Sequence, residues 1–479
     1  MYRSDLRWLK ELMSQLLKVS MIIKGYECGP GVPKFLVQLT HKVSGVIADK
    51  LLVGTAGKDR QISRVYLSDD KGQEVSSASE YLVIQMPVTF DSQKNTAVAC
   101  PFYYNLETLH NTWVEDYPVT IKGLEVFFGG EVAELSGTFD IIHNRLSPDT
   151  DNFNKRGFYS GTYLNPLTKE NEKLTLHYVA YEPKPLKSGE SFPLLIWLHG
   201  QGEGGVDTDI TLLGNEVVAL ARPEIQSHFS TNDQKGVYVL AVQSPTYWMD
   251  EGDGTNGAGA GNSRYTEILM DTIKNYVAST PAVDTKRIYL AGCSNGGYMT
   301  INLAISNPGY FAALVPQAAA YSYYQYERNT DGSYAISPFS NSFIRNDALY
   351  FDEEKILALK EIPMWFIHAA NDTIVNPKDY SLPIYKNLLD SGAENKWFSY
   401  FESVEGRDMQ GVSYLGHLSW IYFFKDQVSG VQDISAIKSA KDLSDFSPSN
   451  KGKGGISIAK VSGKTYHNIF DWLNDQKKA

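Results

Sequence analysis

The sequence of 479 residues contains few cysteines, no long apolar run and no excess of positive charge. Its three cysteines, Cys28, Cys100 and Cys293, are too few for a disulfide framework and lack the spacing of metal ligands. The sequence therefore predicts no metal site. Cys28 and Cys100 can pair with each other or remain free thiols, and both arrangements stay open.

No segment reaches the roughly 18–20 consecutive apolar residues that a membrane-spanning helix needs. The formal net charge of −11, without a run of Lys or Arg, argues against nucleic acid and anionic membranes as partners. Near the N-terminus, Lys10, Glu11 and Lys18 interrupt the apolar pattern, so the continuous core of a signal peptide is missing. The chain as written is expected to be cytoplasmic, whereas an altered or removed natural start would leave secretion open.

The length favours two domains over one. Residues 1–18 form an N-terminal extension, and between residues 19 and 143 short alternating runs are separated by turn-forming residues. Period-2 strands with frequent turns predict an antiparallel β-sandwich. A polar stretch, residues 144–157, is the expected linker. The expected strands include Phe35–Leu39, Ser63–Leu67, Tyr81–Met86, Thr120–Val126 and Glu134–Ile142.

The pattern changes over residues 158–479. After a hairpin expected at 158–183, short continuous apolar runs alternate with segments that favour helices, notably 266–278 and 381–389. Such runs are typical of strands buried on both faces, so the alternation predicts an α/β domain with a mostly parallel sheet and helices on both faces. The runs are Leu194–Leu198, Val237–Val242, Arg287–Ala291, Ala312–Pro316, Met364–His368 and Trp397–Phe401.

A serine between glycines follows the expected strand Arg287–Ala291, in the sequence GCSNG at residues 292–296. A helix-compatible run, Tyr298–Ile305, comes next. A strand, a tight G-x-S-x-G turn and a helix together hold a serine in strained backbone geometry, with its hydroxyl above the sheet edge. We therefore predict Ser294 as a nucleophile, with a glycine-rich packing turn as the alternative. Cys293 lies one position off the apex and is rejected as the nucleophile.

A serine hydroxyl needs a neighbouring base, and behind this turn the partners follow in the order serine, acid, histidine. His417 lies in a loop after the last expected strand, so we predict it as the base. His368 at a strand end and His467 before the final helix are better explained by packing and capping. Asp372 follows the strand before the last and is predicted to orient His417 through Nδ1, with Asp379 as the alternative acid.

Developing negative charge needs hydrogen-bond donors. The strand Leu194–Leu198 leads into the loop HGQGEGG at residues 199–205, which is flexible enough to aim a backbone N–H. We predict that the N–H of Gln201 and that of Asn295, directly after Ser294, form an oxyanion hole. A plain glycine-rich connection is the alternative for this loop.

The motifs LLIWLHGQGEGG, VDTKRIYLAGCSNGGYMT, IPMWFIHAANDTIV, GHLSW and FDWLNDQ in the second domain carry a family resemblance. They resemble α/β-hydrolases of the polyhydroxyalkanoate-depolymerase-like and feruloyl-esterase-like groups, and peptidase-like esterases akin to prolyl oligopeptidases. The run CPFYYNLETLHNTWV makes the first domain similar to the immunoglobulin-like module of some bacterial esterases. The resemblance implies a cofactor-free carboxylesterase for short acyl or aryl esters. Its triad positions fall on Ser294, Asp372 and His417, and its oxyanion positions on Gln201 and Asn295.

Two segments depart from the family pattern. Residues 317–360 form an aromatic-rich excursion, either a cap over the pocket or a packed loop, and residues 426–463 are expected to form an exposed insertion before a last helix. Such segments build pocket walls in this fold, so the substrate does not follow from the resemblance. Tyr321 in the first segment and Trp248 after the strand Val237–Val242 are candidate pocket residues, with a place in the core as the alternative.

Three functions remain as hypotheses. The leading one is a serine carboxylesterase that forms an acyl-enzyme at Ser294, acting on feruloyl or acetylated-glycan esters among others. A serine peptidase of the prolyl-oligopeptidase-like type is the second, because the same triad hydrolyses amides. The third is a non-catalytic glycan-binding protein with a decayed hydrolase domain, favoured by 30 tyrosines and 8 tryptophans but opposed by the ordered triad. A small-molecule or glycan-linked ester is the expected partner, and a homo-oligomer stays open.

Overall fold

The computed structural model describes the chain except residues 1–14, 184–188, 232–233, 341 and 479. Contacts divide the chain into two units, residues 1–105 with 112–151 and residues 106–111 with 152–479, and each is described by itself. Most of the expected N-terminal extension, residues 1–18, lies outside the described residues. In the part of the chain that the structure describes, no helix is both long and apolar enough to cross a membrane.

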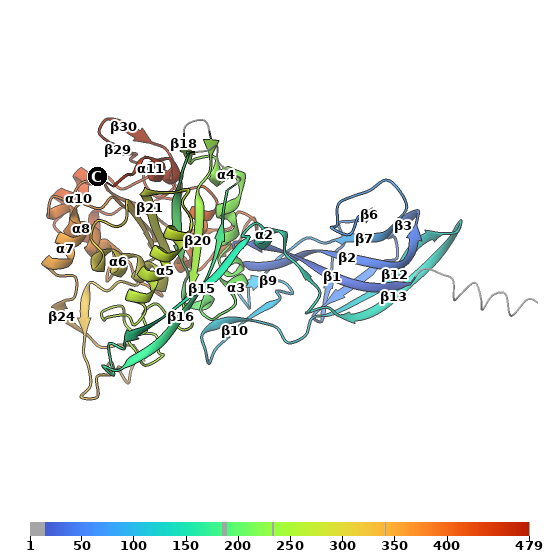
Figure 1. Ribbon diagram of the computed structural model, residues 1–479, viewed down its shortest axis with the longest axis horizontal. Helices are drawn as coiled ribbons and strands as arrows, with labels where there is room; N and C mark the ends of the chain where they lie inside the picture. The colour runs from blue at the N-terminus through green and yellow to red at the C-terminus, as the bar shows by residue number, and fades with distance from the viewer. Residues whose placement is uncertain (1–14, 184–188, 232–233, 341, 479) are drawn as a thin grey trace, which may run out of the picture. The chain divides into compact units, whose positions relative to one another are not determined.

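The first unit contains two sheets of mostly antiparallel strands, drawn in blue to cyan in Figure 1. Along β1, Val19, Met21 and Ile23 are buried, and along β12 Val119 and Ile121 are buried, so alternate residues of both sheets form the core. The structure thus confirms the predicted sandwich. One sheet has the order β14 (Arg145–Leu146), β1 (Leu16–Tyr26), β2 (Gly29–Val43), β7 (Ser79–Gln85), β6 (Arg64–Ser68), and the other β13 (Glu131–Asp140), β12 (Pro118–Phe128), β4 (Leu52–Thr55), β5 (Lys58–Arg60), with β3 (Gly45–Ile47) beside β12.

The expected linker, residues 144–157, contains regular structure. Its strand β14 pairs with β1 through Arg145 and Met21, and helix α2 (Pro148–Asp151) follows. Cys28 and Cys100, whose pairing the sequence left open, are both free thiols. The remaining short strands in this part of the chain are β8 (Phe90–Asp91), β9 (Thr96–Ala97), β10 (Phe102–Asn105) and β11 (His110–Trp113).

The second unit is organised around an eight-stranded sheet. Its first two strands form an antiparallel hairpin, the second pairs antiparallel with β20, and all further pairs are parallel. Each apolar run predicted as a strand overlaps one of its members, which confirms the mostly parallel α/β sheet. The strand order is β15 (Lys155–Leu164), β16 (Asn171–Tyr181), β20 (Tyr238–Gln243), β17 (Phe192–Leu198), β21 (Val283–Cys293), β22 (Ala313–Gln317), β25 (Met364–Ala369), β26 (Lys396–Phe401).

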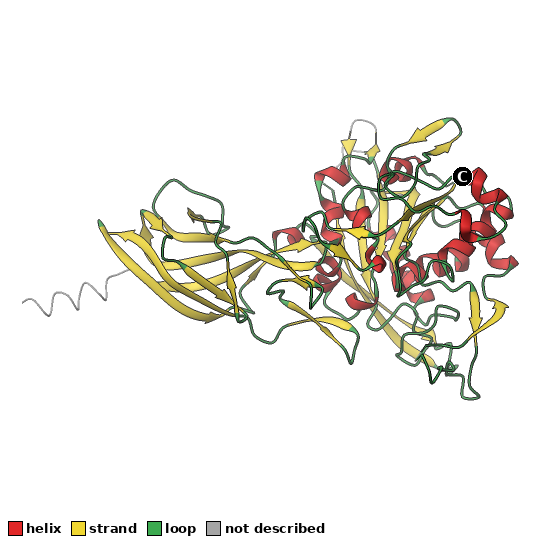
Figure 2. Ribbon diagram, turned by 180° about the vertical axis from the view of Figure 1, so that it is seen from behind, coloured by secondary structure: helices red, strands yellow, loops and turns green. Residues whose placement is uncertain are grey.

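Helices cover both faces of this sheet, as Figure 2 shows in red around the yellow strands. On one face, Ile196 and Leu290 join the core formed with the side chains of α5 (Thr266–Ser279) and α6 (Asn295–Ser306). On the other face, Trp197 contacts Phe424 of α9 and Trp365 contacts Trp472 of α11. The remaining helices include α3 (Thr208–Gly214), α4 (Pro223–Gln226), α7 (Glu353–Lys360), α8 (Ser381–Asp390), α9 (Ile421–Phe424), α10 (Ile434–Ser439) and α11 (Ile469–Asp475).

Residues 426–463, predicted as an exposed insertion, include many exposed residues, such as Ile456 at 87%, but part of the segment packs against the sheet, which the sequence did not predict. Val428, Val431 and Ala459 are completely buried, and the segment runs along the edge strand β26. The N–H of Tyr400 donates to Gly454 O at 2.6 Å, and the N–H of Gln432 donates to Phe398 O at 2.9 Å. An uncovered edge strand exposes unpaired backbone groups, and this segment covers them.

The aromatic excursion between β22 and β25 is packed at its base and exposed at its tip. It contains the antiparallel pair β23 (Tyr324–Tyr326) and β24 (Arg345–Leu349), followed by α7. Tyr321 and Phe351 at the base are 1% and 0% exposed, whereas Phe339 near the tip is 98% exposed.

An ion-paired histidine links α11 to the chain after α9 in the second unit. Nε2 of His228 lies 3.0 Å from Asp426 Oδ2, and its Nδ1 lies 2.8 Å from Asp471 Oδ1. Hydrogen bonds to Asp426 and Asp471 raise the pKa of His228 to about 8, despite partial burial. Because the pKa of His228 in the folded protein exceeds the unfolded value of about 6.5, its two ion pairs stabilise the fold fully below pH ~6.5. This stabilisation is lost as the pH rises through about 8.

We therefore expect the free energy of unfolding of the wild type, relative to His228→Gln, to fall by about 2 kcal/mol between pH 6 and pH 9. Urea denaturation at the two pH values and constant ionic strength measures the difference. Equal pH dependence in the two proteins would show that His228 does not carry this stabilisation.

Candidate active site

Ser294 sits in the sharp turn between β21 and α6. Its backbone has φ 53° and ψ −113°, a conformation that costs a non-glycine residue about 1–3 kcal/mol. The neighbouring glycines are required by close backbone approach: a Cβ at Gly292 would lie 2.5 Å from Gly296 O, and one at Gly296 would overlap the carbonyl oxygen of Leu198. The strain and the tight packing fix the serine above the end of β21.

The structure brings Ser294, His417 and Asp372 into one hydrogen-bonded row. Nε2 of His417 lies 2.9 Å from Ser294 Oγ, and its Nδ1 lies 2.8 Å from Asp372 Oδ2. His417 belongs to the short helix η3 (Gly416–Leu418), and Asp372 follows β25. Because a carboxylate only accepts, Nδ1 carries the proton and Nε2 faces the serine with its lone pair. In this arrangement Nε2 can take the serine proton.

Asp372 accepts four hydrogen bonds. The N–H groups of Ile374 and Val375 donate to Oδ1, each at 2.9 Å, and Oδ2 lies close to both His417 and His368. Burial opposes ionisation of this carboxyl, but the hydrogen bonds from His368 and His417 outweigh it and hold the pKa of Asp372 below its ordinary value. The carboxylate is thus charged and its position is fixed.

His368 is more than the packed strand-end residue that the sequence suggested. Its Nε2 lies 3.0 Å from Asp372 Oδ2 and 2.9 Å from Val375 O, and its Nδ1 lies 2.6 Å from Ser381 Oγ. Both neighbours of Nε2 are acceptors, so this nitrogen carries the proton. The separation of His368 and Asp372 in the sequence permits this contact but does not predict it, because the same separation also allows the two side chains to point apart.

The loop after β17 is held by His199. The N–H of Ser244 donates to His199 Nε2 at 3.0 Å, and Nδ1 lies 2.6 Å from Gly200 O. Burial lowers the pKa of His199 to about 3, so the ring is neutral and Nδ1–H donates to that carbonyl. Gly200 C=O and Gln201 N–H belong to one trans peptide and point in opposite directions. His199 therefore directs the Gln201 N–H away from itself.

Asn295 is the first residue of α6. The first backbone N–H groups of a helix have no acceptor within the helix, and the helix dipole adds positive potential there. The N–H groups at this terminus are therefore suited to an anionic oxygen formed next to Ser294. The side chains of Asn295 and Gln201 are linked through Asn256, which sequence reasoning did not single out because nothing local marks it in a glycine-rich loop.

The two candidate pocket residues lie in the core. Trp248 is 0% exposed, with its ring 5.2 Å from that of His199, and Tyr321 is 1% exposed, stacked 5.5 Å from Tyr298. Neither ring is open to solvent, because both belong to the hydrophobic core of the second unit.

The residue rejected as nucleophile and the alternative acid have other roles in the structure. Cys293 is buried, and burial raises the pKa of its thiol well above the ordinary value, which opposes a role as a nucleophile. Asp379, the alternative acid, forms an ion pair with Arg345. Among the described residues, no cluster of His, Cys, Asp and Glu could hold a metal ion.

The parallel sheet, the turn at Ser294 and the order serine, acid, histidine define an α/β-hydrolase fold. Residues 18–131 match the model of the esterase Ig-like N-terminal domain, and residues 264–403 match that of the prolyl oligopeptidase family. The first unit is thus an immunoglobulin-like domain of the kind found in esterases, and the protein is a serine hydrolase. The second match includes Ser294 and Asp372 but ends before His417.

One solved structure supports this fold, and two others are more distant. A thermostable esterase is similar with a TM-score of 0.59 and 21% identity, over 85% of this chain and 96% of its own, which shows the fold. A ferulic acid esterase (TM-score 0.36, 14% identity, 57% of this chain and 95% of its own) is more distant. So is the Pyrococcus horikoshii acylaminoacyl peptidase (0.34, 17%, 77% and 49%), and neither carries an argument here. No curated protein matches the sequence.

Proposed function

We propose that the protein is a serine carboxylesterase that hydrolyses short-chain acyl or aryl esters through an acyl-enzyme at Ser294. The observation that carries this proposal is the row in which Nε2 of His417 lies 2.9 Å from Ser294 Oγ and Nδ1 lies 2.8 Å from Asp372 Oδ2. Both distances fall within the reach that proton transfer needs before any substrate is bound.

In the first half-reaction, Ser294 Oγ attacks the ester carbonyl carbon while its proton passes to Nε2 of His417. Asp372 stabilises the resulting imidazolium without itself becoming protonated. The carbonyl oxygen becomes an oxyanion and accepts from the N–H groups of Gln201 and Asn295. Collapse of the tetrahedral intermediate breaks the bond to the alcohol oxygen, which leaves with the proton from His417.

In the second half-reaction, water replaces the alcohol. His417 takes a proton from the water as its oxygen attacks the acyl carbon, and a second oxyanion forms at the same donors. When this intermediate collapses, Ser294 Oγ regains the proton from His417 and the carboxylic acid is released. The same base therefore serves both steps, and the enzyme returns to its starting state.

One observation supports an ester as the substrate, and a second supports an apolar acyl or aryl group. Residues 18–131 match a domain described from esterases. The loops that carry the oxyanion residue, the acid and the base also expose Val206, Ile374 and Leu415, which are 64%, 64% and 53% exposed. Exposed aliphatic side chains near a reacting group favour apolar substrate groups, because their burial on binding is favourable.

The match of residues 264–403 to the prolyl oligopeptidase family supports a second candidate, a serine peptidase. The same nucleophile and base hydrolyse amides, so the leaving group separates the two functions. We expect the p-nitrophenyl ester of one acyl group to be hydrolysed with a kcat/KM at least about 10³-fold above that of the matching p-nitroanilide after subtraction of the uncatalysed rates.

A panel of esters from acetyl to octanoyl, together with methyl ferulate and acetylated xylan, tests the acyl and alcohol preference. Covalent labelling by a fluorophosphonate, mapped by mass spectrometry, is expected at Ser294 and tests the non-catalytic alternative. Cleavage of the anilide as fast as of the ester would favour the peptidase, and an unlabelled protein would favour the glycan-binding hypothesis.

A further inference from the structure

A chain of side-chain amides connects the two residues proposed to supply the oxyanion hole. Nδ2 of Asn295 donates to Asn256 Oδ1 at 2.7 Å, and Nδ2 of Asn256 donates to Gln201 Oε1 at 2.5 Å. The three residues come from separate parts of the fold: Gln201 follows β17, Asn256 lies between β20 and α5, and Asn295 begins α6. Asn256 therefore bridges the loop after β17 and the N-terminus of α6.

A backbone donor at one end determines the orientation of these three side-chain amides. The N–H of Met249 donates to Asn295 Oδ1 at 3.2 Å, and a backbone N–H can only donate. The oxygen of the Asn295 amide must therefore face Met249, which leaves Nδ2 for Asn256. The same logic turns the Asn256 oxygen toward Asn295 and its Nδ2 toward Gln201, so one orientation satisfies each contact.

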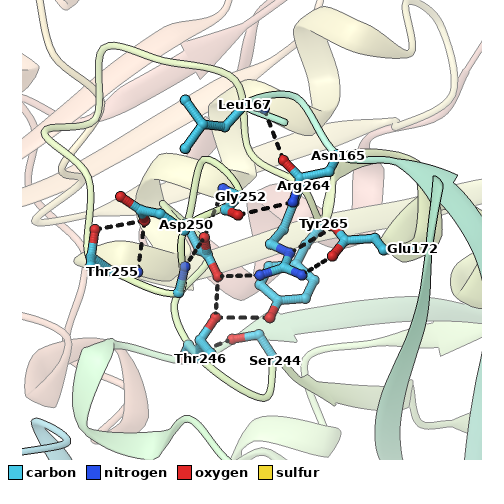
Figure 3. A network of polar contacts seen from close by, with 12 residues as sticks. Asn165, Leu167, Glu172, Ser244, Thr246, Asp250, Gly252, Thr255, Arg264 and Tyr265 are labelled. Carbon is cyan, nitrogen blue, oxygen red and sulfur yellow. Dashed lines mark hydrogen bonds and ion pairs between the residues drawn. The ribbon is translucent and has the colours of Figure 1, made fainter. Parts of the chain in front are cut away.

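The loop that carries Met249 and Asn256 is anchored by a partly buried ion pair (Figure 3). Asp250, whose side chain is 0% exposed, accepts from Arg264 at 3.2 Å and from Thr246 Oγ1 at 2.7 Å through Oδ2. Its Oδ1 accepts from the N–H groups of Gly252 and Gly254 at 2.8 and 3.0 Å. Asp250 thus holds both sides of the turn that precedes Asn256.

Arg264 extends this anchor to the sheet. Its guanidinium also binds Glu172 of β16 through Nε, at 3.0 Å, and through Nη2 (Figure 3). A bidentate pair of this kind restricts both distance and orientation. The loop that carries Asn256 is therefore tied through Asp250 and Arg264 to strand β16.

We propose that Asn256 is a positioning residue that sets the distance between the oxyanion donors Gln201 N–H and Asn295 N–H. The inference rests on the proposed function, because it assigns Asn256 a role in the same reaction. Donors stabilise the oxyanion only when both lie about 2.7–3.1 Å from it. A displacement of about 1 Å can lower a rate by about 10²-fold. Asn256 acts on the reaction through these two neighbours and does not contact the reacting atoms.

The test compares Asn256→Ala with Asn262→Ala, a matched change at an exposed asparagine of the same loop. We expect Asn256→Ala to lower kcat about 10- to 100-fold, with KM within about threefold of wild type, because substrate binding precedes oxyanion formation. Affinity for a trifluoromethyl ketone, which forms an oxyanion on Ser294, falls by the same factor, and the pH profile of kcat does not move. Asn262→Ala keeps wild-type kinetics.

A second variant, Gln201→Met, removes the amide oxygen that accepts from Asn256 and keeps the side-chain length. If the two residues act through one link, the double variant Asn256→Ala/Gln201→Met is no slower than Asn256→Ala alone. Multiplied losses in the double variant, a loss confined to KM, or equal kcat values for Asn256→Ala and Asn262→Ala would each overturn the proposal.

The result for Asn256 can be distinguished from a failure of the proposed esterase function. If the wild type cleaved neither ester nor amide, the proposed function would fail. The rate of fluorophosphonate labelling at Ser294 would still compare Asn256→Ala with Asn262→Ala, because the phosphonyl oxygen occupies the oxyanion position. Slower labelling of Asn256→Ala alone would support the positioning role, and a wild type that is not labelled at all would overturn both.

Discussion

Replacement of Ser294 by alanine is expected to lower kcat for a p-nitrophenyl ester by about 10⁵- to 10⁶-fold, to the level that binding and oxyanion donors alone sustain. The reason is the loss of the only atom of this residue that can form the acyl bond. Alanine retains the Cβ, so the backbone strain at φ 53° and ψ −113° stays, and the thermal unfolding midpoint should remain within a few degrees of wild type. An esterase assay and differential scanning calorimetry on the same preparation measure kcat and the unfolding midpoint.

The matched control is Ser306→Ala, the same substitution at an exposed serine at the other end of α6, which should retain wild-type turnover. Ser294→Gly provides a second control, because glycine relieves a strain of about 1–3 kcal/mol at the cost of about 0.5–1 kcal/mol in unfolded-chain entropy. It should be inactive and at least as stable as wild type. More than about one per cent residual activity in purified Ser294→Ala would remove the serine from its proposed role.

The sequence predicted those parts of the site that depend on contiguous residues. The turn at Ser294 follows from a strand, two glycines and a helix in direct succession, and the strands that end near Gln201 and Asp372 are continuous apolar runs. Parallel strands place their carboxyl ends at one edge of the sheet, so loops distant in the chain converge there. His417 could then be chosen from its place after the last strand. The structure brings these side chains together, and their catalytic roles stay predictions.

The features that the sequence did not predict depend on side-chain orientation or on distant pairing. Asn256 and the ion pair of Asp250 with Arg264 lie in a glycine-rich loop whose path no local pattern determines. Trp248 was a candidate pocket residue with a place in the core as the alternative, because an aromatic ring serves both. Residues 426–463 looked like a solvent-exposed loop because they are polar, but their backbone groups complete the edge of β26, a role that polarity does not reveal.

Asp372→Asn is expected to lower kcat by about 10⁴-fold while the residue keeps its size. Oδ1 of Asp372 accepts from the N–H groups of Ile374 and Val375, so the oxygen of an asparagine is held on that side and its NH₂ faces the two histidines. His417 must then turn an unprotonated Nδ1 toward the amide, which leaves a proton on Nε2 facing Ser294. A base already protonated at that nitrogen does not accept the serine proton.

Because His368 also contacts Asp372, we expect the Asp372→Asn substitution to have a larger effect than in a site where only one histidine contacts the acid. Its Nε2–H donates to both Asp372 Oδ2 and Val375 O, so the asparagine NH₂ opposes a donor that cannot change tautomer without losing the Val375 contact. We therefore expect Asp372→Asn to lose about 1–3 kcal/mol of stability as well as activity. Asp379→Asn, the same change at the alternative acid paired with Arg345, should alter kcat less than about twofold and stability by no more than about 1 kcal/mol. A reversal of these two results would transfer the orienting role from Asp372 to Asp379.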